Sequence, residues 1–218
     1  MRTQPIEQCL SGFYPDLSYE AYDADPALRH SVLNRFATSP NGSDVPTESP
    51  AMVLGRVFHH YALTPKAPSP PAPTDAAMLR DALAMAQAFR ESTVARSLFP
   101  GAFFEASLFW DVGGIAAKAR PDILAQTHVA DLKTTRSLDH FENAALGYGY
   151  HRQAAWYADA VETVMGIRPE RFLLVAVEKT APYKVEVFEL TVGQLRAARQ
   201  QNALQLELFK RSLKGGAK

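Results

Sequence analysis

Three short apolar runs in the middle of the chain most strongly limit the folds open to it. They are separated by turn residues and are Phe103–Trp110, Ile115–Leu124 and His128–Thr134. Runs of this length bounded by turns are typical of β-strands, and Gly113-Gly114 between the first two is typical of a hairpin. We therefore expect a β-sheet built around the middle of the sequence.

Helical patterns flank these runs on both sides. We expect helices at Ala51–Leu63, Asp75–Ser92 (capped by Thr74), Tyr150–Met165 and from Thr191 to about Arg211, and a second pair of strands at Phe172–Glu178 and Lys184–Leu190. Gln194 lies three residues after Thr191 and completes a capping box at the start of the last helix. This order of elements predicts an α/β fold in which a central mixed β-sheet is flanked by helices.

The length and composition suit one ordinary globular domain. The chain has 218 residues, of which 47% are hydrophobic and 21% are charged. We expect a single domain over residues 1–218, with loops at 38–50 and 64–74, which are rich in turn residues and proline, and a tail at 214–218. No apolar run approaches the ~18–20 residues that cross a bilayer. No membrane association is therefore expected.

Charge and cysteine content exclude few classes of protein. The formal net charge is zero, which argues mildly against a protein that coats nucleic acid. It does not argue against a DNA enzyme, because acidic metal ligands cancel basic phosphate contacts in the total. Cys9 is the only cysteine, which excludes an internal disulfide and a multi-cysteine zinc site. The amino terminus lacks the pattern of a secretory signal, and we expect a cytoplasmic location.

Two of the expected strands carry charged residues in positions that bring them together. Asp122 closes a Pro-Asp step on one strand, and the next strand carries Asp131 and, two residues later, Lys133. Residues i and i+2 of a strand lie on the same face, so Asp131 and Lys133 point the same way. A hairpin places Asp122 beside them. The sequence therefore predicts two carboxylates and an amine in one patch.

This set of groups suits the hydrolysis of a phosphodiester bond. The reaction needs an activated water and neutralisation of charge on the phosphate oxygens, and Mg²⁺, with Mn²⁺ as a substitute, supplies both. Asp122, Asp131 and the carbonyl of Leu132 are the expected ligands. Lys133 either orients the attacking water or, if its pKa falls, accepts its proton. The alternative is a cross-strand salt bridge with no catalytic role.

Glu105 is a further candidate, because it lies within an otherwise apolar strand. A buried carboxylate without a partner costs on the order of several kcal/mol, so it needs one. A metal ion is one possible partner, and a salt bridge to Lys118 or Arg120 across the expected hairpin is another. The residues alone leave both open.

Other polar residues give weaker signals. Gln153 and Tyr157 are four residues apart and share a helix face. Arg136 follows the second charged strand and is placed to bind a phosphate at a DNA end. His59 lies one turn after Gly55 on an expected helix, where a histidine is more often part of the core. Each of these residues is equally compatible with an ordinary helix face or strand end.

Taken in order, the motifs resemble those of PD-(D/E)xK nucleases of the RecB exonuclease group. They are Gly55-x-x-x-His59, Glu105, Arg120-Pro-Asp122, Asp131-Leu-Lys133 and Gln153-x-x-x-Tyr157. The chain is most similar to the phage and prophage recombination exonucleases typified by exonuclease VIII (RecE), and more distantly similar to lambda exonuclease. The resemblance implies the restriction-endonuclease-like core of this group.

The resemblance also implies roles for individual residues. The implied metal ligands and catalytic residues are His59, Glu105, Asp122, Asp131, Leu132 and Lys133. The implied DNA contacts are Gln153, Tyr157, Arg136, Ser31 and Arg120. Ser31 is included because it resembles an early serine segment that helps to form a phosphate pocket. Gln153 and Tyr157 form an accessory motif that braces the active site or touches DNA.

The activity implied is that of a magnesium-dependent exonuclease acting on linear double-stranded DNA. Relatives are ring-shaped homotrimers that digest DNA processively from the 5′ end and release 5′-phosphomononucleotides. They leave a 3′ single strand, which a partner annealing protein uses in recombination. The alternatives are another endonuclease or repair nuclease on the same core, or a catalytically silent DNA-end-binding protein. A metabolic enzyme with a chance Asp-x-Lys is a further alternative, although the chain has no glycine-rich phosphate loop.

Overall fold

The computed structural model describes residues 11–38, 48–64 and 75–215. Its elements in chain order are β1 (Gly12–Tyr14), α1 (Tyr19–Ala24), β2 (Leu28–Arg29), α2 (His30–Thr38), α3 (Pro50–Leu63), α4 (Ala76–Glu91), α5 (Thr93–Arg96), β3 (Phe103–Phe104), β4 (Ser107–Asp111), β5 (Ala116–Ala119), β6 (Ile123–Leu124), β7 (His128–Thr135), α6 (Phe141–Gly147), α7 (Tyr150–Met165), β8 (Arg171–Glu178), β9 (Val185–Glu189) and α8 (Val192–Gly215). This mixture of strands and helices confirms the predicted α/β class.

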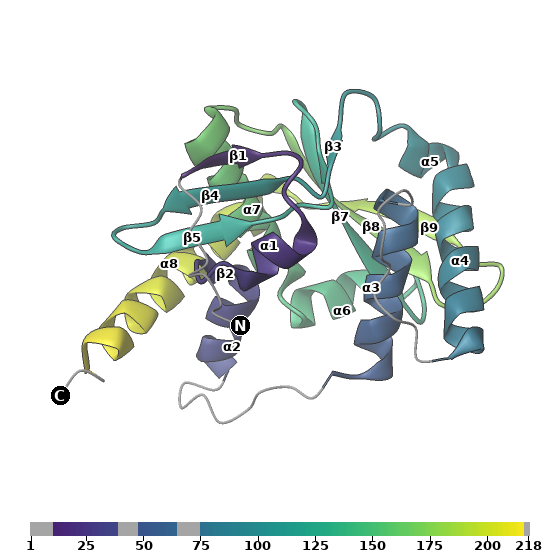
Figure 1. Ribbon diagram of the computed structural model, residues 1–218, viewed down its shortest axis with the longest axis horizontal. Helices are drawn as coiled ribbons and strands as arrows, with labels where there is room; N and C mark the ends of the chain where they lie inside the picture. The colour runs from purple at the N-terminus through teal and green to yellow at the C-terminus, as the bar shows by residue number, and fades with distance from the viewer. Residues whose placement is uncertain (1–10, 39–47, 65–74, 216–218) are drawn as a thin grey trace, which may run out of the picture.

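The strands form two sheets (Figure 1). The five-stranded sheet has the order β3-β6-β7-β8-β9, and the four-stranded sheet has the order β1-β4-β5-β2. In the larger sheet β7 and β8 are parallel and the other neighbours are antiparallel, so this sheet is mixed. β7 therefore lies inside the sheet, hydrogen-bonded on one side to β6 and along its whole length on the other side to β8.

A sharp break in the backbone divides the strands that were expected in one central sheet. The run Phe103–Trp110 is interrupted at Glu105, whose φ of 54° lies in the left-handed region, so that β3 joins one sheet and β4 the other. The partner run is interrupted at Arg120-Pro121, between β5 and β6. The Glu105 N–H donates to the Asp122 carbonyl at 3.1 Å. The two sheets consequently meet at a hydrogen-bonded bend.

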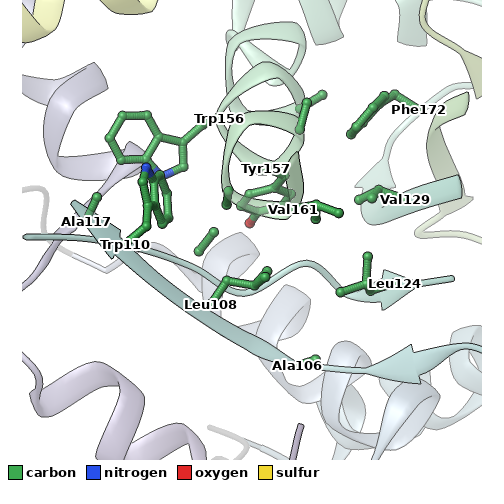
Figure 2. Packing of buried hydrophobic residues seen from close by; sticks show 14 of the residues in the cluster. Ala106, Leu108, Trp110, Ala117, Leu124, Val129, Trp156, Tyr157, Val161 and Phe172 are labelled. Carbon is green, nitrogen blue, oxygen red and sulfur yellow. The ribbon is translucent and has the colours of Figure 1, made fainter. Parts of the chain in front are cut away.

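Helices cover both faces of the larger sheet (Figure 1). α3 and α4 pack on one face through an apolar core that includes Phe58 and Leu132. α7 covers the other face and extends over the smaller sheet, where the Trp156 and Trp110 rings are 5.1 Å apart. Figure 2 shows Trp156 and Tyr157 of α7 packed towards the strands of this core. α7 is therefore the element that joins the two sheets.

The structure confirms the predicted cap of α8 and shows that the predicted cap of α4 was wrong. The predicted capping box is present at the start of α8, where the Gln194 N–H donates to the Thr191 hydroxyl and the Thr191 N–H to the Gln194 side chain. The cap of α4 is Asp75, whose carboxylate accepts a hydrogen bond from the Met78 N–H at 2.7 Å. Thr74 was the predicted cap, and it lies outside the described residues.

Several short elements lack the periodicity that would have predicted them. β1, α1, β2, α5 and α6 are each two to seven residues long, too short for a repeating apolar pattern to stand out. α8 extends to Gly215, beyond the expected end near Arg211. Most of the predicted loops at 38–50 and 64–74 lies outside the described residues. No helix in the described part of the chain is long and apolar enough to span a membrane.

A buried histidine stands at the junction of α2, α7 and α8. His30 is 6% exposed, and its ring lies 6.3 Å from the ring of Trp156 on α7. Burial, together with the nearby charges of Arg152, Lys133 and His151, lowers the pKa of His30 from 6.5 to about 4, although the nearby Asn202 side chain on α8 opposes the shift. The folded protein therefore keeps this imidazole neutral over most of the mildly acidic range.

We expect His30 to make the fold sensitive to acid. Between about pH 6.5 and pH 4 the unfolded histidine binds a proton that the folded one does not, so stability falls as the pH falls through this window. The loss is on the order of 3 kcal/mol. In urea denaturation, the stability difference between the parent and His30→Gln should shrink by this amount from pH 6.5 to pH 4. His140→Gln, which removes an exposed histidine, is the control, and a constant parent–variant difference would contradict the prediction.

Candidate metal and catalytic site

Three side chains from separate parts of the chain converge at the bend between the sheets. His59 comes from α3, Glu105 from the break between β3 and β4, and Asp122 from the residue before β6. One ligand atom of each lies within 4.8 Å of the other two. Two carboxylate oxygens and an imidazole nitrogen at this spacing form a donor set suited to a divalent cation. The residues present therefore fit a metal ion.

Asp122 is the most firmly held member of this cluster. It is 5% exposed, its Oδ1 lies 3.3 Å from His59 Nδ1, and its Oδ2 accepts a hydrogen bond from the Leu132 N–H at 2.5 Å. Burial favours the neutral acid, but the charges of His59 and Lys133 and the Leu132 N–H outweigh it and lower the pKa of Asp122. Asp122 is therefore a carboxylate in the resting protein.

His59 carries the matching positive charge. Burial opposes a charged imidazole, but the Asp122 carboxylate outweighs this effect and raises the pKa of His59 to about 8. A histidine binds a metal only in its neutral form, so a cation that reaches Nδ1 replaces a proton there. The proton on His59 therefore supplies the positive charge beside Asp122 that a bound cation would supply.

Glu105 has the salt bridge and the metal-site position that the sequence offered as alternatives. Arg120 Nε donates to Glu105 Oε2 at 2.7 Å, and the same guanidinium donates to the Ser107 hydroxyl and the Leu17 carbonyl. Lys118, the other predicted partner, instead donates to backbone carbonyl groups of the α1 segment. Because a carboxylate has two oxygens, the ion pair with Arg120 leaves Glu105 able to take part in the cluster with His59 and Asp122.

Asp131 and Lys133 lie on the same face of β7, as their spacing predicts. Leu132 between them is fully buried in the opposite core, against α3 and α4. Lys133 Nζ contacts Asp131 Oδ2 directly, and both side chains are nearly buried. The hydrogen bond from the Leu132 N–H to Asp122 joins this pair to the metal-ligand cluster. The predicted patch of Asp122, Asp131 and Lys133 is therefore assembled.

α7 braces the lysine from the other side. Lys133 Nζ donates to Gln153 Oε1 at 3.0 Å, and Gln153 Nε2 donates to the Tyr157 hydroxyl at 2.9 Å. The Tyr150 ring lies against the same ammonium group, with its centroid 4.5 Å from Nζ. Tyr157 is 8% exposed. Of the two roles that the sequence allowed for Gln153 and Tyr157, these inward contacts support bracing of the site.

The surroundings of Lys133 keep it charged. Burial favours the neutral amine, but Asp131 and Asp122 outweigh it and raise the pKa of Lys133. Burial raises the pKa of Asp131 to about 6 despite the adjacent lysine, and burial and the Asp122 charge raise the pKa of Glu105. A protonated lysine does not accept a proton from water. The geometry therefore favours the orienting role for Lys133 over that of a general base.

The cluster of candidate ligand atoms overlaps in part with the predicted ligand set, and a ligand role for Asp131 stays a prediction. His59 and Asp122 are in the cluster, but its third member is Glu105, and Asp131 is outside it with its carboxylate against Lys133. The observed contact of Leu132 is made by its N–H, and a role for its carbonyl stays a prediction. Glu105 joins the cluster because the break in the backbone at this residue lies beside Asp122, whose carbonyl accepts the Glu105 N–H.

The remaining predicted DNA contacts lie in different environments. Arg136 is exposed just after the end of β7, and Ser31 is exposed in the first turn of α2. Arg120 points inward, because its guanidinium is held by Glu105, Ser107 and Leu17. Arg120 is therefore placed to position Glu105, whereas the sequence indicated a DNA contact.

Tyr150 is a site residue that the sequence analysis missed. It lies three residues before Gln153, and residues three apart on a helix share a face. That spacing was a usable signal, because both side chains contact Lys133. Ser107 could not have been found in this way, since its contact with Arg120 follows from the pairing of β4 with β5.

The sequence matches one family model over residues 72–218, which is more than half of the chain. The model is described as a PDDEXK-like domain of unknown function (DUF3799). This chain belongs to that family. The matched range contains the two parts of the PDDEXK pattern, Pro121-Asp122 and Asp131-x-Lys133, while His59 precedes it. The assembled patch described above contains these matching residues, Asp122, Asp131 and Lys133.

The PDDEXK-like fold is shared with a protein of known structure. A protein from Eubacterium rectale, described as a candidate exonuclease, is similar with a TM-score of 0.72 and 16% identity, covering 93% of this chain and 88% of that chain. At this identity the likeness shows the fold alone. A second structure, described as SSO0001, has a TM-score of 0.33 and 19% identity over 80% of this chain and 85% of that chain, which is too low a similarity to indicate a shared fold. No curated protein sequence matches the chain.

We expect Arg120 and Glu105 to be strongly coupled. Arg120→Met leaves the nearly buried Glu105 carboxylate without its cation, which costs about 3 kcal/mol or more of unfolding free energy. In a protein that already carries Glu105→Gln, Arg120→Met should cost much less. Urea denaturation in EDTA of the parent, the two single variants and the double variant measures the coupling energy. Arg171→Met, which breaks an exposed ion pair with Glu189, is the control and should cost about 1 kcal/mol or less. Equal costs of Arg120→Met with and without Glu105 would refute the coupling.

Proposed function

We propose that this PDDEXK-like protein is a metal-dependent deoxyribonuclease, and specifically an exonuclease that degrades linear double-stranded DNA. The observation that carries the proposal is the convergence of His59, Glu105 and Asp122 beside the Asp131–Lys133 pair. Phosphodiester hydrolysis requires an activated water and positive charge near the phosphate oxygens. A metal-ligand cluster next to a charged lysine meets both requirements.

His59, Glu105 and Asp122 would hold Mg²⁺, or Mn²⁺ in its place. The bound ion would polarise the scissile phosphate and lower the pKa of a water molecule bound to it. The protein's own contribution is the direction of the Lys133 ammonium group. That group has three N–H donors, and Asp131 and Gln153 each engage it. One donor remains to bind the attacking water or a phosphate oxygen. Lys133 therefore acts as an oriented cation in the proposed reaction.

The mode of digestion is also proposed. Processive digestion from 5′ to 3′, with release of 5′-phosphomononucleotides and a remaining 3′ single strand for recombination, is supported by the order of motifs shared with the RecE-type exonucleases. We place Arg136 and Ser31, which are exposed, on phosphates of the DNA end. The same resemblance supports a homotrimer whose single-stranded product is used by an annealing protein, and we keep the cytoplasmic location expected from the sequence as part of the proposal. A ring would also accommodate the zero net charge, with basic groups facing its channel.

One assay tests the proposed function. The purified protein is incubated with linear duplex DNA labelled at one 5′ end, and separately with a closed circular duplex, in Mg²⁺, Mn²⁺ or EDTA. Early release of labelled mononucleotide from the linear DNA, only with metal and with the circle intact, is the expected result. Cutting of the circular DNA would mean that the protein is an endonuclease and not an exonuclease. Binding to DNA ends without any cleavage would support the silent end-binding protein instead.

We expect Asp122→Asn to remove metal-dependent cleavage. The amide keeps the size of the side chain but loses the charge that attracts the cation, and the loss of metal catalysis corresponds to about 10³-fold or more in rate. Calorimetric titration with Mn²⁺ should show weaker binding by the same variant. Asp16→Asn, which changes an exposed aspartate, is the control for both measurements. Cleavage by Asp122→Asn near the parent rate would remove this residue from the site.

We expect Lys133→Met to separate catalysis from metal binding. Removal of an oriented donor should lower kcat by about 10²- to 10³-fold. Metal affinity should not fall, because a positive charge beside the cation has been removed. The readouts are single-turnover cleavage and Mn²⁺ titration, with Lys184→Met as an exposed-lysine control. Loss of metal binding together with activity would indicate that Lys133 maintains the site and has no direct part in the reaction.

A further inference from the structure

An exposed aromatic side chain lies at the edge of the proposed active site. Tyr148, in the turn between α6 and α7, is 67% exposed, which makes it the most exposed aromatic residue in the described part of the chain. Single exposed aromatic residues are common on protein surfaces, so a binding role for Tyr148 rests on what its ring contacts. The Tyr148 ring is connected through Tyr150 to Lys133 of the proposed active site.

Two ring contacts connect Tyr148 to Lys133. The Tyr148 and Tyr150 rings are stacked, with centroids 5.6 Å apart and planes at 28° to each other. The Tyr150 ring also lies 4.5 Å from the Lys133 ammonium group and 6.4 Å from the Phe141 ring, measured from its centroid. Tyr150 itself is only partly exposed, while Tyr148 is open to solvent. The stack therefore leads from the reacting group outward to a large exposed ring.

The backbone holds Tyr148 in one place. The Tyr148 N–H donates to the Ala144 carbonyl at 2.9 Å, and the Gly149 N–H donates to the Leu146 carbonyl at 3.1 Å. Gly149 has a φ of 75°, and a Cβ atom there would lie 2.6 Å from Arg152 Nη2. The turn thus requires glycine next to Tyr148, and it places the Arg152 guanidinium against the same turn. A ring fixed in this way loses little freedom when a ligand stacks on it.

We infer that Tyr148 is a stacking platform for a nucleobase at the strand end whose phosphate lies near Lys133. This inference rests on the proposed function and extends it to a second binding site. Aromatic side chains that bind single strands stack on bases without regard to sequence. A base within a duplex has both faces covered by its neighbours, so the base that stacks here belongs to a strand terminus. Arg152, beside Gly149, supplies a cation for the phosphate of that nucleotide.

The test compares Tyr148 variants on DNA ends with and without the base. Tyr148→Ala should weaken binding of a short single strand in EDTA, and raise KM for linear duplex with Mg²⁺, by about 5-fold or more, with kcat nearly unchanged. Tyr148→Phe should behave as the parent, because it keeps the ring. Leu146→Ala, which shortens an exposed side chain in the same turn, is the matched control.

Abasic nucleotides identify the base that is bound. An abasic residue is moved one position at a time from the strand end, and at one position it should weaken binding by the parent to the level of Tyr148→Ala while leaving that variant unaffected. Equal losses for parent and variant at every position would overturn the inference. A fall in kcat with unchanged KM would also overturn it, since it would mean that Tyr148 only supports Tyr150 and Lys133.

The outcomes separate this inference from the proposed function. If the protein cleaves linear DNA but Tyr148→Ala changes neither KM nor binding, the stacking site alone is wrong. If it binds single strands in a Tyr148-dependent way but cleaves nothing, the nuclease proposal fails and the platform stands. A folded protein that neither binds nor cleaves DNA would refute both.

Discussion

The position of Asp122 is the constraint on which the rest of the structure depends. Its backbone carbonyl accepts a hydrogen bond from the Glu105 N–H across the bend, its Oδ2 accepts another from the Leu132 N–H of β7, and its Oδ1 faces His59 on α3. One residue thus joins both sheets and a helix. A buried carboxylate with fewer donors would be costly, so the packing of the fold and the geometry of the site are set by the same contacts.

Each of the three acidic groups around this point has its own cation, and the three cations differ in kind. Arg120 pairs with Glu105, Lys133 with Asp131, and His59 with Asp122. Arginine stays charged at any physiological pH, and the acidic neighbours of Lys133 raise its pKa. Only the histidine, with a pKa of about 8, loses its proton readily near neutrality. The proton that a metal ion would displace is therefore the one on His59, with the other two ion pairs retained around it.

The sequence predicted the parts of this arrangement that follow from local periodicity. The spacing of Asp131 and Lys133 placed them on one strand face, and α7 has the predicted limits, Tyr150–Met165. The bend at Glu105 could not be predicted, because nothing in an apolar run marks a residue with positive φ. The partner of Glu105 was left open between a metal and a salt bridge to Lys118 or Arg120, and the structure shows the salt bridge to Arg120 with Glu105 inside the cluster that fits a metal ion. Such pairings depend on how sheets pack, and local sequence carries little information about that.

The geometry around Lys133 depends in turn on a helix whose main contacts are apolar. Tyr150, Gln153 and Tyr157 recur at helical spacing on α7, which turns one face of that helix towards the lysine. The position of that face is set by the packing of Trp156 on Trp110 of the smaller sheet (Figure 2). Because close-packed cores transmit small displacements, a change of volume at Trp110 would move the brace and redirect the ammonium group. The smaller sheet contributes none of the three residues of the metal-ligand cluster, yet the direction of the Lys133 ammonium group depends on it.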